Sequence, residues 1–383
     1  MPSASAAKSH DIAIIGGGIV GLWTAFEAAR QGRSVVLVEK RRVGAGASGG
    51  LLGALMPHQP TGWNAKKQFQ LDGLLTLEDE IAVLQETTGL TAGSARGGRL
   101  MPIRNAEKRR QSGQWAEASH DVWPYPFRWQ VAEATIHSRW MPAQQMPFGA
   151  NFDNLSARID PRALVSALKK ALEMAGVTIR EMCEVTAIGP DGWLALAQDD
   201  ELAAERVVVA AGWEAFGLVD GAFGEPVGGG VKGQAALLRP AEPVDPASPI
   251  LYDDGTYVIA HDSGLLAVGS TSENEFGDPD TTDEKLDTVI GRARDISPAL
   301  EGAEIVERWA GVRPKAAGRE PLVGPLPGFD TVLIATGGYK ISFAIAHLIA
   351  RAVLMQADGK DPGFLPDEFR PESRLKPRLR QAP

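Results

Sequence analysis

Residues 11–40, DIAIIGGGIVGLWTAFEAARQGRSVVLVEK, decide the fold. Their first apolar run, at 12–15, predicts a short buried strand. The helical spacing after it ends at Gly32, which suits the left-handed cap of a helix. The run SVVLVEK then predicts a second buried strand that ends at Glu39. A strand, a helix and a strand within about thirty residues form the βαβ unit with which dinucleotide-binding folds begin.

The turn between the first strand and the helix carries the glycine spacing G-x-G-x-x-G, at Gly16, Gly18 and Gly21. The first glycine permits the tight turn, the second lets a pyrophosphate approach the backbone, and the third lets the helix pack close to the sheet. The helix N-terminus adds partial positive charge, and the Glu39 carboxylate can accept hydrogen bonds from ribose hydroxyls. The strands, helix, glycines and acid together predict dinucleotide binding, whereas the glycines alone fit any tight turn.

The composition excludes several classes of function. With 383 residues, 44% of them hydrophobic, the chain can bury a large core, and at about 150 residues per domain it is long enough for two or three domains. A net charge of −9 disfavours general binding to nucleic acid or to anionic membranes, since both require a positive field. The single cysteine, Cys183, excludes an internal disulfide framework and a cysteine-based zinc cluster, and we expect no metal site. We expect a reducing, cytoplasmic compartment.

Further elements can be placed from periodicity and capping residues. A glycine-rich loop at 44–53 lets the backbone approach a ligand. A helix is predicted over 66–88, and Asp160 followed by Pro161 predicts the start of another helix, which ends at Gly176. Short runs between 226 and 275, separated by Gly, Pro and Asp, predict a mostly antiparallel sheet. The stretch 92–150 is rich in Trp, Pro and Arg and supports no assignment.

Three segments bear on membrane association and export. No uninterrupted apolar run reaches the roughly 18 residues of a membrane span. The nearest candidate, 341–355, carries His347 and Arg351 and is predicted to be an amphipathic helix. The Ala- and Ser-rich residues 1–10 lead into a run that breaks at the glycine motif, so no signal peptide is expected. The Pro-rich and charged tail from Pro362 is expected on the surface.

Five segments, in this order, carry a resemblance to a known family: GGGIVGLWTA, EKRRVGAGASGG, VVVAAGWEA, WAGVRPKAAGREPLVGPLPG and ATGGYKISFAIA. They resemble the D-amino-acid oxidase-like family of FAD enzymes, and within it the glycine oxidase and sarcosine oxidase branch, over nearly the whole chain. The runs KGQ at 232–234 and LYDDGTYVIA at 251–260 also match glycine oxidase-like enzymes. The resemblance implies an α/β fold with a Rossmann-like FAD-binding domain (1–90, 150–225 and 305–383). A second, mostly antiparallel β-sheet domain (91–149 and 226–304) would bind the substrate.

The resemblance also implies which residues contact FAD. The glycine motif and the first helical residues would face the pyrophosphate, and the end of the second strand would face the ribose. Backbone NH groups at 338–343 would face the flavin pyrimidine oxygen, where a helix N-terminus stabilises negative charge. The implied contacts are Gly16, Gly18, Ile19, Val20, Gly21, Glu39, Lys40, Ala47, Ser48, Gly53, Ala54, Leu55, Val185, Ala211, Gly212, Gly338, Tyr339, Lys340, Ile341, Ser342 and Phe343. The covalent sarcosine oxidases attach flavin through a late cysteine, whereas Cys183 falls in the adenine-side strand, so FAD is expected to be noncovalent.

Arg313 in WAGVRP is the first candidate for the substrate site, because a guanidinium fork can hold a carboxylate through two hydrogen bonds. In the resembling family the matching arginine binds the substrate carboxylate; the alternative is an ion pair with a protein acid. Tyr257 would be the second carboxylate contact and Tyr252 would line the pocket, unless both are core aromatics. Lys340 would face a second carboxylate, polarise oxygen or pair with a protein acid. His58 would line the substrate entrance or have a structural role.

The implied activity is oxidation of glycine, sarcosine, a D-amino acid or an iminodiacetate-like amine. A hydride would pass from Cα to flavin N5, and the resulting imine would hydrolyse, which requires no Ser/His/Asp or metal constellation if the amine arrives neutral. Oxygen is the expected acceptor, and a quinone-linked D-amino acid dehydrogenase is an alternative. The loop GGLLGALMPHQP is closer to the oxidoreductase domain of tRNA wobble-uridine modifying enzymes, so an oxidase of carboxymethylaminomethyl-uridine is a second alternative. A flavoprotein that only relays electrons is a third, and homo-oligomer formation is left open.

Overall fold

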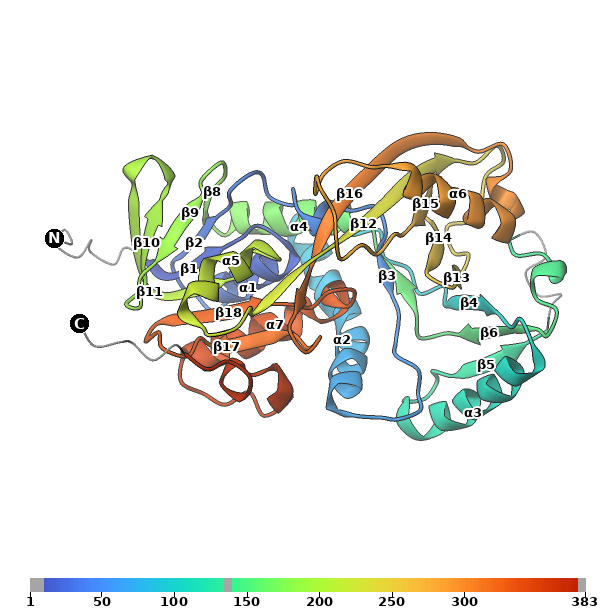
Figure 1. Ribbon diagram of the computed structural model, residues 1–383, viewed down its shortest axis with the longest axis horizontal. Helices are drawn as coiled ribbons and strands as arrows, with labels where there is room; N and C mark the ends of the chain where they lie inside the picture. The colour runs from blue at the N-terminus through green and yellow to red at the C-terminus, as the bar shows by residue number, and fades with distance from the viewer. Residues whose placement is uncertain (1–9, 134–139, 378–383) are drawn as a thin grey trace.

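The computed structural model describes residues 10–133 and 140–377 (Figure 1). Our expectation for the N-terminal segment concerns residues 1–10, of which 1–9 lie outside the described part of the chain. Within the described ranges, two eight-stranded β-sheets organise the fold, one in each half of the molecule in Figure 1. The long strands β12 (Gly228–Arg239) and β16 (Glu304–Ala316) pair with each other and run from one half to the other.

The first sheet contains the predicted βαβ unit. Its strand order is β17 (Leu322–Pro325), β18 (Val332–Thr336), β11 (Glu201–Val209), β1 (His10–Ile15), β2 (Val35–Val38) and β8 (Thr178–Arg180). These neighbours are parallel except for β17 and β18. All four residues of β2 are buried, as in strands that are covered on both faces. The antiparallel strands β9 (Val185–Ile188) and β10 (Trp193–Leu196) extend this sheet beside β11.

Helices cover both faces of this sheet. One face packs against α1 (Ile19–Arg30), α2 (Ala65–Thr88), α4 (Pro161–Met174) and α7 (Ser342–Ala357), and the other against α5 (Glu214–Val219). The helices predicted at 66–88 and after Asp160 are confirmed. The prediction that α7 is amphipathic is wrong, because α7 is buried on nearly all sides. Its polar groups bond to α2: the buried His347 to Thr76, and the half-buried Arg351 to Glu80.

The second sheet confirms the predicted antiparallel region. Its strand order is β16, β12, β15 (Leu266–Gly269), β14 (Thr256–Ala260), β13 (Ile250–Asp253), β4 (Arg99–Pro102), β6 (Ala150–Asp153) and β5 (Trp129–Ala132). Of these pairs, β13 and β4 alone are parallel. One face packs against α6 (Glu284–Ile296), and the other packs against residues 51–56 of the loop that follows β2. In that loop, β3 (Ala54–Leu55) pairs with β7 (Ala157–Arg158).

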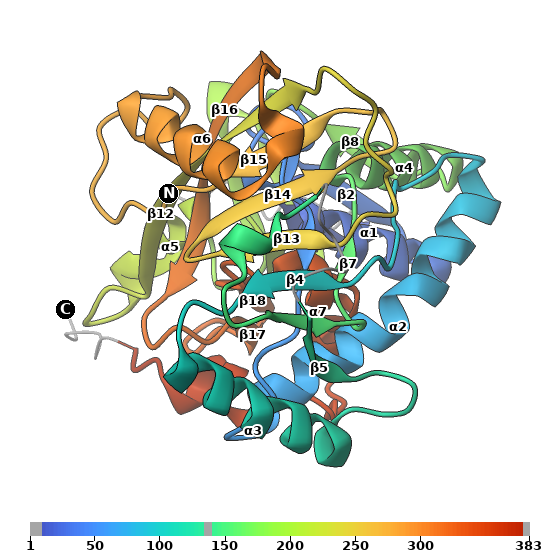
Figure 2. The same ribbon diagram turned by 90° about the vertical axis from the view of Figure 1, so that its right-hand side faces the viewer.

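Two helices of the second half were not predicted. Figure 2 shows α3 (Ala106–Val122) beside β5 and α6 over the opposite end of the sheet. In α3, Asn105 caps the N-terminus and the fully buried positions are Ser112 and Ser119. Trp115, Ala116 and Val122 pack against the core, but serines occupy the most buried positions, so the apolar stripe by which a helix is predicted from sequence is sparse.

The predicted domain boundaries remain a prediction. β6 and β16 belong to the second sheet, although the prediction assigned residues 150–225 and 305–383 to the FAD-binding domain. Sheet membership therefore favours boundaries after β6 and after β16.

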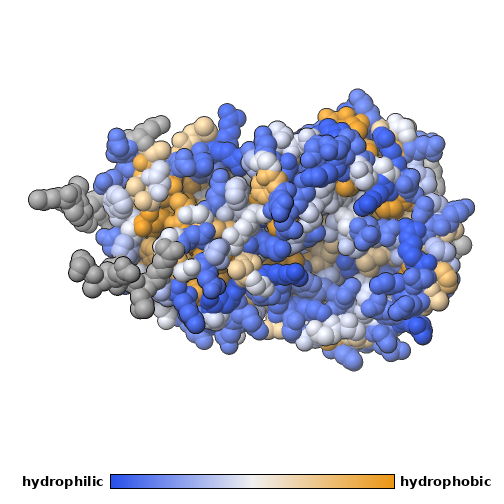
Figure 3. Space-filling view, in the orientation of Figure 1, coloured by the Kyte–Doolittle hydropathy of each residue, from blue (hydrophilic) through white to orange (hydrophobic). Residues whose placement is uncertain are grey.

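The visible face of the molecule is mainly hydrophilic. Figure 3 shows that hydrophilic side chains cover most of the visible face, with smaller apolar areas between them. No helix in the described ranges has both the length and the apolar character needed to cross a bilayer.

Candidate active site

A cavity of about 750 Å³ opens at the carboxyl ends of the parallel strands. Residues that follow β1, β2, β11 and β18 line one side of it, and residues of the second sheet line the other. Ligands of open α/β sheets bind at this edge. The cavity is therefore the candidate site for both a cofactor and a substrate.

Most of the predicted cofactor contacts line this cavity. They are Gly16, Gly18, Ile19, Val20, Glu39, Lys40, Ala47, Ser48, Ala54, Val185, Ala211, Gly212, Gly338, Tyr339, Lys340, Ile341, Ser342 and Phe343. Gly21, Gly53 and Leu55 do not line it, and their contacts with FAD remain a prediction. A Cβ atom at Gly21 would lie 2.0 Å from the Gly16 carbonyl oxygen, and one at Gly53 would lie 1.8 Å from a neighbouring carbonyl oxygen. Leu55 is buried in the core, so all three positions serve packing.

The N-terminus of α1 faces the cavity, and its N-cap residue has no side chain to cap it. Gly18 occupies the N-cap, and the first turn contains no acidic residue. The amide of Ile19 donates to Ser48 Oγ at 2.9 Å, which orients that hydroxyl at the cavity wall. Glu39 lies beside this turn and accepts hydrogen bonds from the amides of Gly17 (2.7 Å) and Arg41 (2.8 Å). A fixed carboxylate next to an open helix N-terminus fits the ribose and pyrophosphate of a dinucleotide.

Lys40 lines the cavity, but its ammonium group is already paired. Its Nζ lies 3.0 Å from a Glu184 carboxylate oxygen and 3.5 Å from one of Glu214. The hydrogen bond to Glu184 is the main cause that raises the pKa of Lys40. The predicted ribose contact of Lys40 therefore falls to its backbone or its aliphatic stem.

The loop before α7 presents a second helix N-terminus to the cavity. No side chain caps α7, and its first turn has no acidic residue. The Tyr339 amide donates to the Pro314 carbonyl (3.0 Å) and the Ile341 amide to the Gly338 carbonyl (2.9 Å). These two amides already donate to protein carbonyls, so the other amides of 338–343 would make the predicted contact with the flavin ring oxygen. An open N-terminus here fits the anionic side of a flavin ring, and together with the α1 site it fits FAD.

Arg313 extends from β16 across the neighbouring strand β12. Its Nη2 donates to Ser270 Oγ (2.9 Å) and its Nη1 to the Thr271 carbonyl (3.3 Å). The guanidinium lies over Gly233, where a Cβ atom would stand 2.1 Å from Nη2. Among the described residues, no carboxylate lies within ion-pair distance of Arg313, and burial lowers its pKa. The alternative of an ion pair with a protein acid is therefore not what the structure shows.

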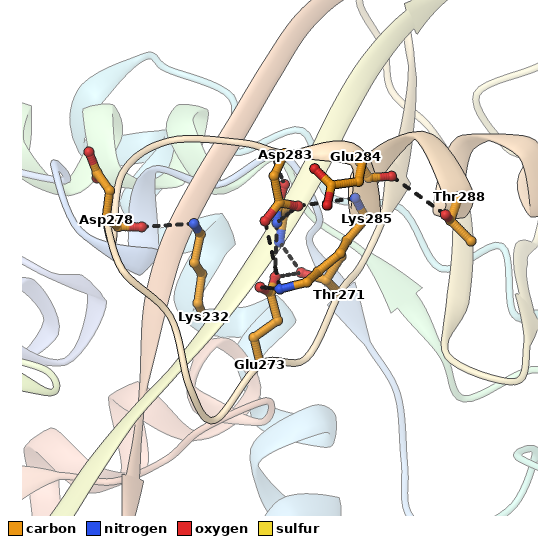
Figure 4. Close-up of polar contacts among 9 residues, drawn as sticks. Lys232, Thr271, Glu273, Asp278, Asp283, Glu284, Lys285 and Thr288 are labelled. Atoms are coloured by element: carbon orange, nitrogen blue, oxygen red, sulfur yellow. Dashed lines mark hydrogen bonds and ion pairs between the residues drawn. The ribbon is translucent and has the colours of Figure 1, made fainter.

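A polar network around Glu273 supports Thr271, the residue whose carbonyl accepts a hydrogen bond from Arg313 (Figure 4). Thr271 Oγ1 donates to Glu273 (2.6 Å), and Gln234 Nε2 donates to the same carboxylate oxygen (2.9 Å). Lys285 binds the other oxygen of Glu273 at 2.7 Å. Glu273 thus holds the Thr271 side chain and pairs with Lys285, while its charge reaches Arg313 only through space.

The two predicted tyrosines lie side by side in the cavity wall. Tyr252 and Tyr257 are directly paired across β13 and β14, with ring centroids 4.9 Å apart. Burial raises the pKa of Tyr257 to about 12, while the charges of Arg99 and Arg313 act in the opposite direction. The Tyr257 hydroxyl is thus neutral at ordinary pH and lies within electrostatic reach of two guanidinium groups.

Lys340 is exposed in the cavity beside Arg313. Its Nζ lies 5.5 Å from the centre of the Tyr339 ring, and no carboxylate of the described residues lies within ion-pair distance. Desolvation and then the Arg313 charge lower the pKa of Lys340. Lys340 therefore does not pair with a described acid, and its two other predicted roles, contact with a second substrate carboxylate and polarisation of oxygen, stay predictions.

His58 lines the cavity, and with it lie residues that the sequence did not single out. Desolvation, followed by the charges of Lys66, Lys67 and Arg99, lowers the pKa of His58 to about 4, so its imidazole is neutral. The additional cavity residues include Met56, Lys67, Gln70, Arg99, Trp129 and Trp309. They come from three distant parts of the chain and carry no shared motif, so only the tertiary fold brings them together.

Comparisons with known proteins agree with this geometry. Residues 11–354 match the family described as FAD dependent oxidoreductase. The chain is 30% identical to a glycine oxidase from Pseudomonas putida, over 96% of this chain and 100% of that relative. A solved glycine oxidase from Geobacillus kaustophilus matches with a TM-score of 0.85 and 23% identity, over 94% of this chain and 98% of that one. An iminodiacetate oxidase from Chelativorans sp. matches with a TM-score of 0.83 and 20% identity, again over 94% and 98%.

Proposed function

Because the chain belongs to the DAO family of FAD-dependent oxidoreductases, we propose that it oxidises a small amino carboxylate at its carbon–nitrogen bond. The observation that carries this proposal is Arg313, a partly buried cation in the cavity that no described carboxylate neutralises. The family resemblance expected from the five sequence segments is confirmed. Substrates of the proposed class are glycine, sarcosine, D-amino acids and iminodiacetate-like amines.

The side chains of the cavity would bind and orient this substrate. Arg313 would hold the carboxylate through its guanidinium fork, and the neutral Tyr257 hydroxyl would donate a second hydrogen bond. Tyr252 and Trp309 would exclude water from the reacting carbon. FAD, when bound, supplies the acceptor for the two electrons and the hydrogen of the Cα–H bond, as a hydride at N5. The amine nitrogen keeps its lone pair for the imine, so the protein needs no base if the amine arrives neutral.

Oxygen as the electron acceptor and a cytoplasmic location belong to the same proposal. A quinone in place of oxygen would leave the substrate side unchanged. The loop GGLLGALMPHQP, from which Leu52, Met56 and His58 line the cavity, supports the tRNA wobble-uridine alternative. The net charge of −9 disfavours that alternative, because an RNA substrate requires a positive surface.

Anaerobic reduction of the flavin tests the proposal. The purified holoenzyme is mixed without oxygen with glycine, sarcosine, iminodiacetate and D-amino acids, and the flavin absorbance is followed. We expect bleaching with at least one of these amines and recovery of the absorbance when air is admitted. Bleaching without recovery in air, followed by recovery with a quinone, would replace oxygen as acceptor. An oxidised spectrum with every amine would refute the proposed substrate class.

A further inference from the structure

Three buried polar atoms of residues that line the cavity have no hydrogen-bond partner among the described residues. They are Arg99 Nη2, His58 Nε2 and Gln70 Oε1. The other groups of these side chains are fixed around Met56. Gln70 Nε2 donates to the Met56 carbonyl at 2.8 Å, and Arg99 Nη1 lies 3.6 Å from Met56 Sδ. Arg99 is 6% exposed and Gln70 is 2% exposed, so bulk water does not satisfy these atoms.

The strand register places Arg99 on the substrate face of the second sheet. Arg99 pairs with Ile250 of β13, and Leu251 of β13 pairs with Val258 of β14. Side chains alternate along a strand, so Arg99 and Tyr257 point to the same face of the sheet. Their strands are two apart and their positions differ by two residues along the strand, which together correspond to roughly 12 Å at the backbone. The effect of both Arg99 and Arg313 on the pKa of Tyr257 agrees with this position between the two arginines.

The net positive charge in this part of the cavity comes from Lys67, because the charge of Arg99 is paired with Asp153. Asp153 binds Arg99 Nε at 2.8 Å, and its other oxygen accepts the Ser156 amide at 2.7 Å. Lys67 adds a second cation, which donates to the carbonyls of Gln59 (3.0 Å) and Thr61 (2.5 Å) and has no ion pair with a described acid. The low pKa of His58, caused first by desolvation and then by the nearby cations, reflects the same positive potential. We call Met56, His58, Lys67, Gln70 and Arg99 the Arg99 recess.

We propose that the Arg99 recess binds a second acidic group of the substrate, so that the preferred substrates are amines with two acidic groups. Arg99 Nη2 would donate to this group, and His58 Nε2 would donate a second hydrogen bond in the tautomer that carries its proton there. N-carboxymethyl glycines and acidic D-amino acids have this chemistry. The inference rests on the proposed function, because Arg313 has to hold the first carboxylate. The inference also makes Arg99, and not Lys340, the residue that binds the second acidic group, since Lys340 lies beside Arg313.

Binding of unreactive acids tests the recess apart from catalysis. Succinate and propionate have the same carbon chain up to the second carboxylate, and isothermal titration of the oxidised holoenzyme gives a Kd for each. We expect the wild type to bind succinate at least about ten times more tightly than propionate. The double variant Arg99→Met, Asp153→Asn should weaken succinate binding by about ten- to a hundred-fold, the loss expected for a charge-assisted hydrogen bond. Changing Arg99 alone would leave Asp153 buried without its partner, which is why both are replaced.

A control variant and a second test variant separate the effect of the Arg99 recess from effects on folding. Arg104→Met is the matched control: Arg104 pairs with Asp253 on the same sheet but does not line the cavity, so both Kd values should stay unchanged. If the double variant does not fold, His58→Leu should weaken succinate binding about two- to tenfold, as expected for one hydrogen bond. Equal affinities for the two acids in the wild type would overturn the inference. So would an unchanged succinate Kd in a folded double variant, or a selective loss of succinate binding in Lys340→Met.

Kinetics separate this inference from the proposed function. The ratio of kcat/KM for iminodiacetate to that for sarcosine should fall about ten- to a hundred-fold in the double variant. Turnover of sarcosine with no preference for iminodiacetate would refute the Arg99 recess and leave the proposed function standing. Failure of every amine to reduce the flavin would refute the proposed function, while the succinate titration would still decide whether the recess binds an acid.

Discussion

Gly233 should control the position of Arg313, although it makes no polar contact with substrate. A Cβ atom at position 233 would lie between 2.1 and 2.3 Å from three atoms of the guanidinium, Nη1, Nη2 and Cζ. Ordinary van der Waals contact begins near 3.4 Å, so Gly233→Ala forces the guanidinium to move by at least about 1 Å. The displaced group is the end of a flexible side chain, and the variant should therefore fold with nearly unchanged stability. A shift of about 1 Å in a positioning group can cost up to roughly 100-fold in rate.

The assay compares Gly233→Ala, Arg313→Ala and the double variant on one amino carboxylate. We expect KM to rise about ten- to a hundred-fold in each single variant, the range for a lost charge-assisted hydrogen bond, with FAD content unchanged. In the double variant Gly233→Ala should add almost nothing, because the group that it displaces is gone. Full kcat/KM in Gly233→Ala would refute the assignment of Arg313 to the carboxylate in this position. An additive loss in the double variant would show that Gly233 acts through another group.

Three further predictions concern the cofactor, Lys340 and acid stability. Gly18→Val should yield colourless protein, because the branched side chain of valine projects into the cavity at the open N-terminus of α1. The wild type should be yellow and release FAD on acid precipitation. Stoichiometric FAD in the variant would contradict the α1 site. Lys340→Met should lower turnover of sarcosine and iminodiacetate by the same factor, measured separately for flavin reduction and reoxidation, and a loss confined to the diacid would contradict this. Burial lowers the pKa of His347 to about 3 in the folded chain, so the unfolded chain binds a proton first as pH falls below about 6.5 and stability should drop by about 1.4 kcal/mol per pH unit. In His347→Gln the thermal midpoint should depend less on pH between about 6.5 and 4, and an unchanged slope would assign the acid sensitivity to other groups.

Local patterns were sufficient to predict β1, α1 and β2 of the first sheet and the helices α2 and α4. The spacing of Gly16, Gly18 and Gly21 and the apolar run before them specify a strand, a turn and a helix from neighbouring residues alone. Asp160 and Pro161 predicted the start of α4 correctly, since capping depends on contacts within one turn. α3 was missed because few apolar residues hold it, among them Trp115 and Val122, and its most buried positions are serines. The polarity of α7 was misjudged because the partner of Arg351, Glu80, lies 271 residues away.

In the candidate substrate site, too, some residues could be found from sequence motifs, whereas others are placed only by strand pairing. Arg313 and Tyr257 lie in segments that resemble a family, so the sequence alone was enough to name them. Arg99 lies in the stretch 92–150, where no periodicity or motif marks it, and its neighbours in the recess belong to the loop after β2 and to α2. Its position depends on the parallel pairing of β4 with β13, two strands that lie far apart in the sequence and are joined by no local signal. A shift of that pairing by one residue would turn Arg99 to the opposite face of the sheet, so the feature proposed to select the substrate is fixed by packing of the whole sheet.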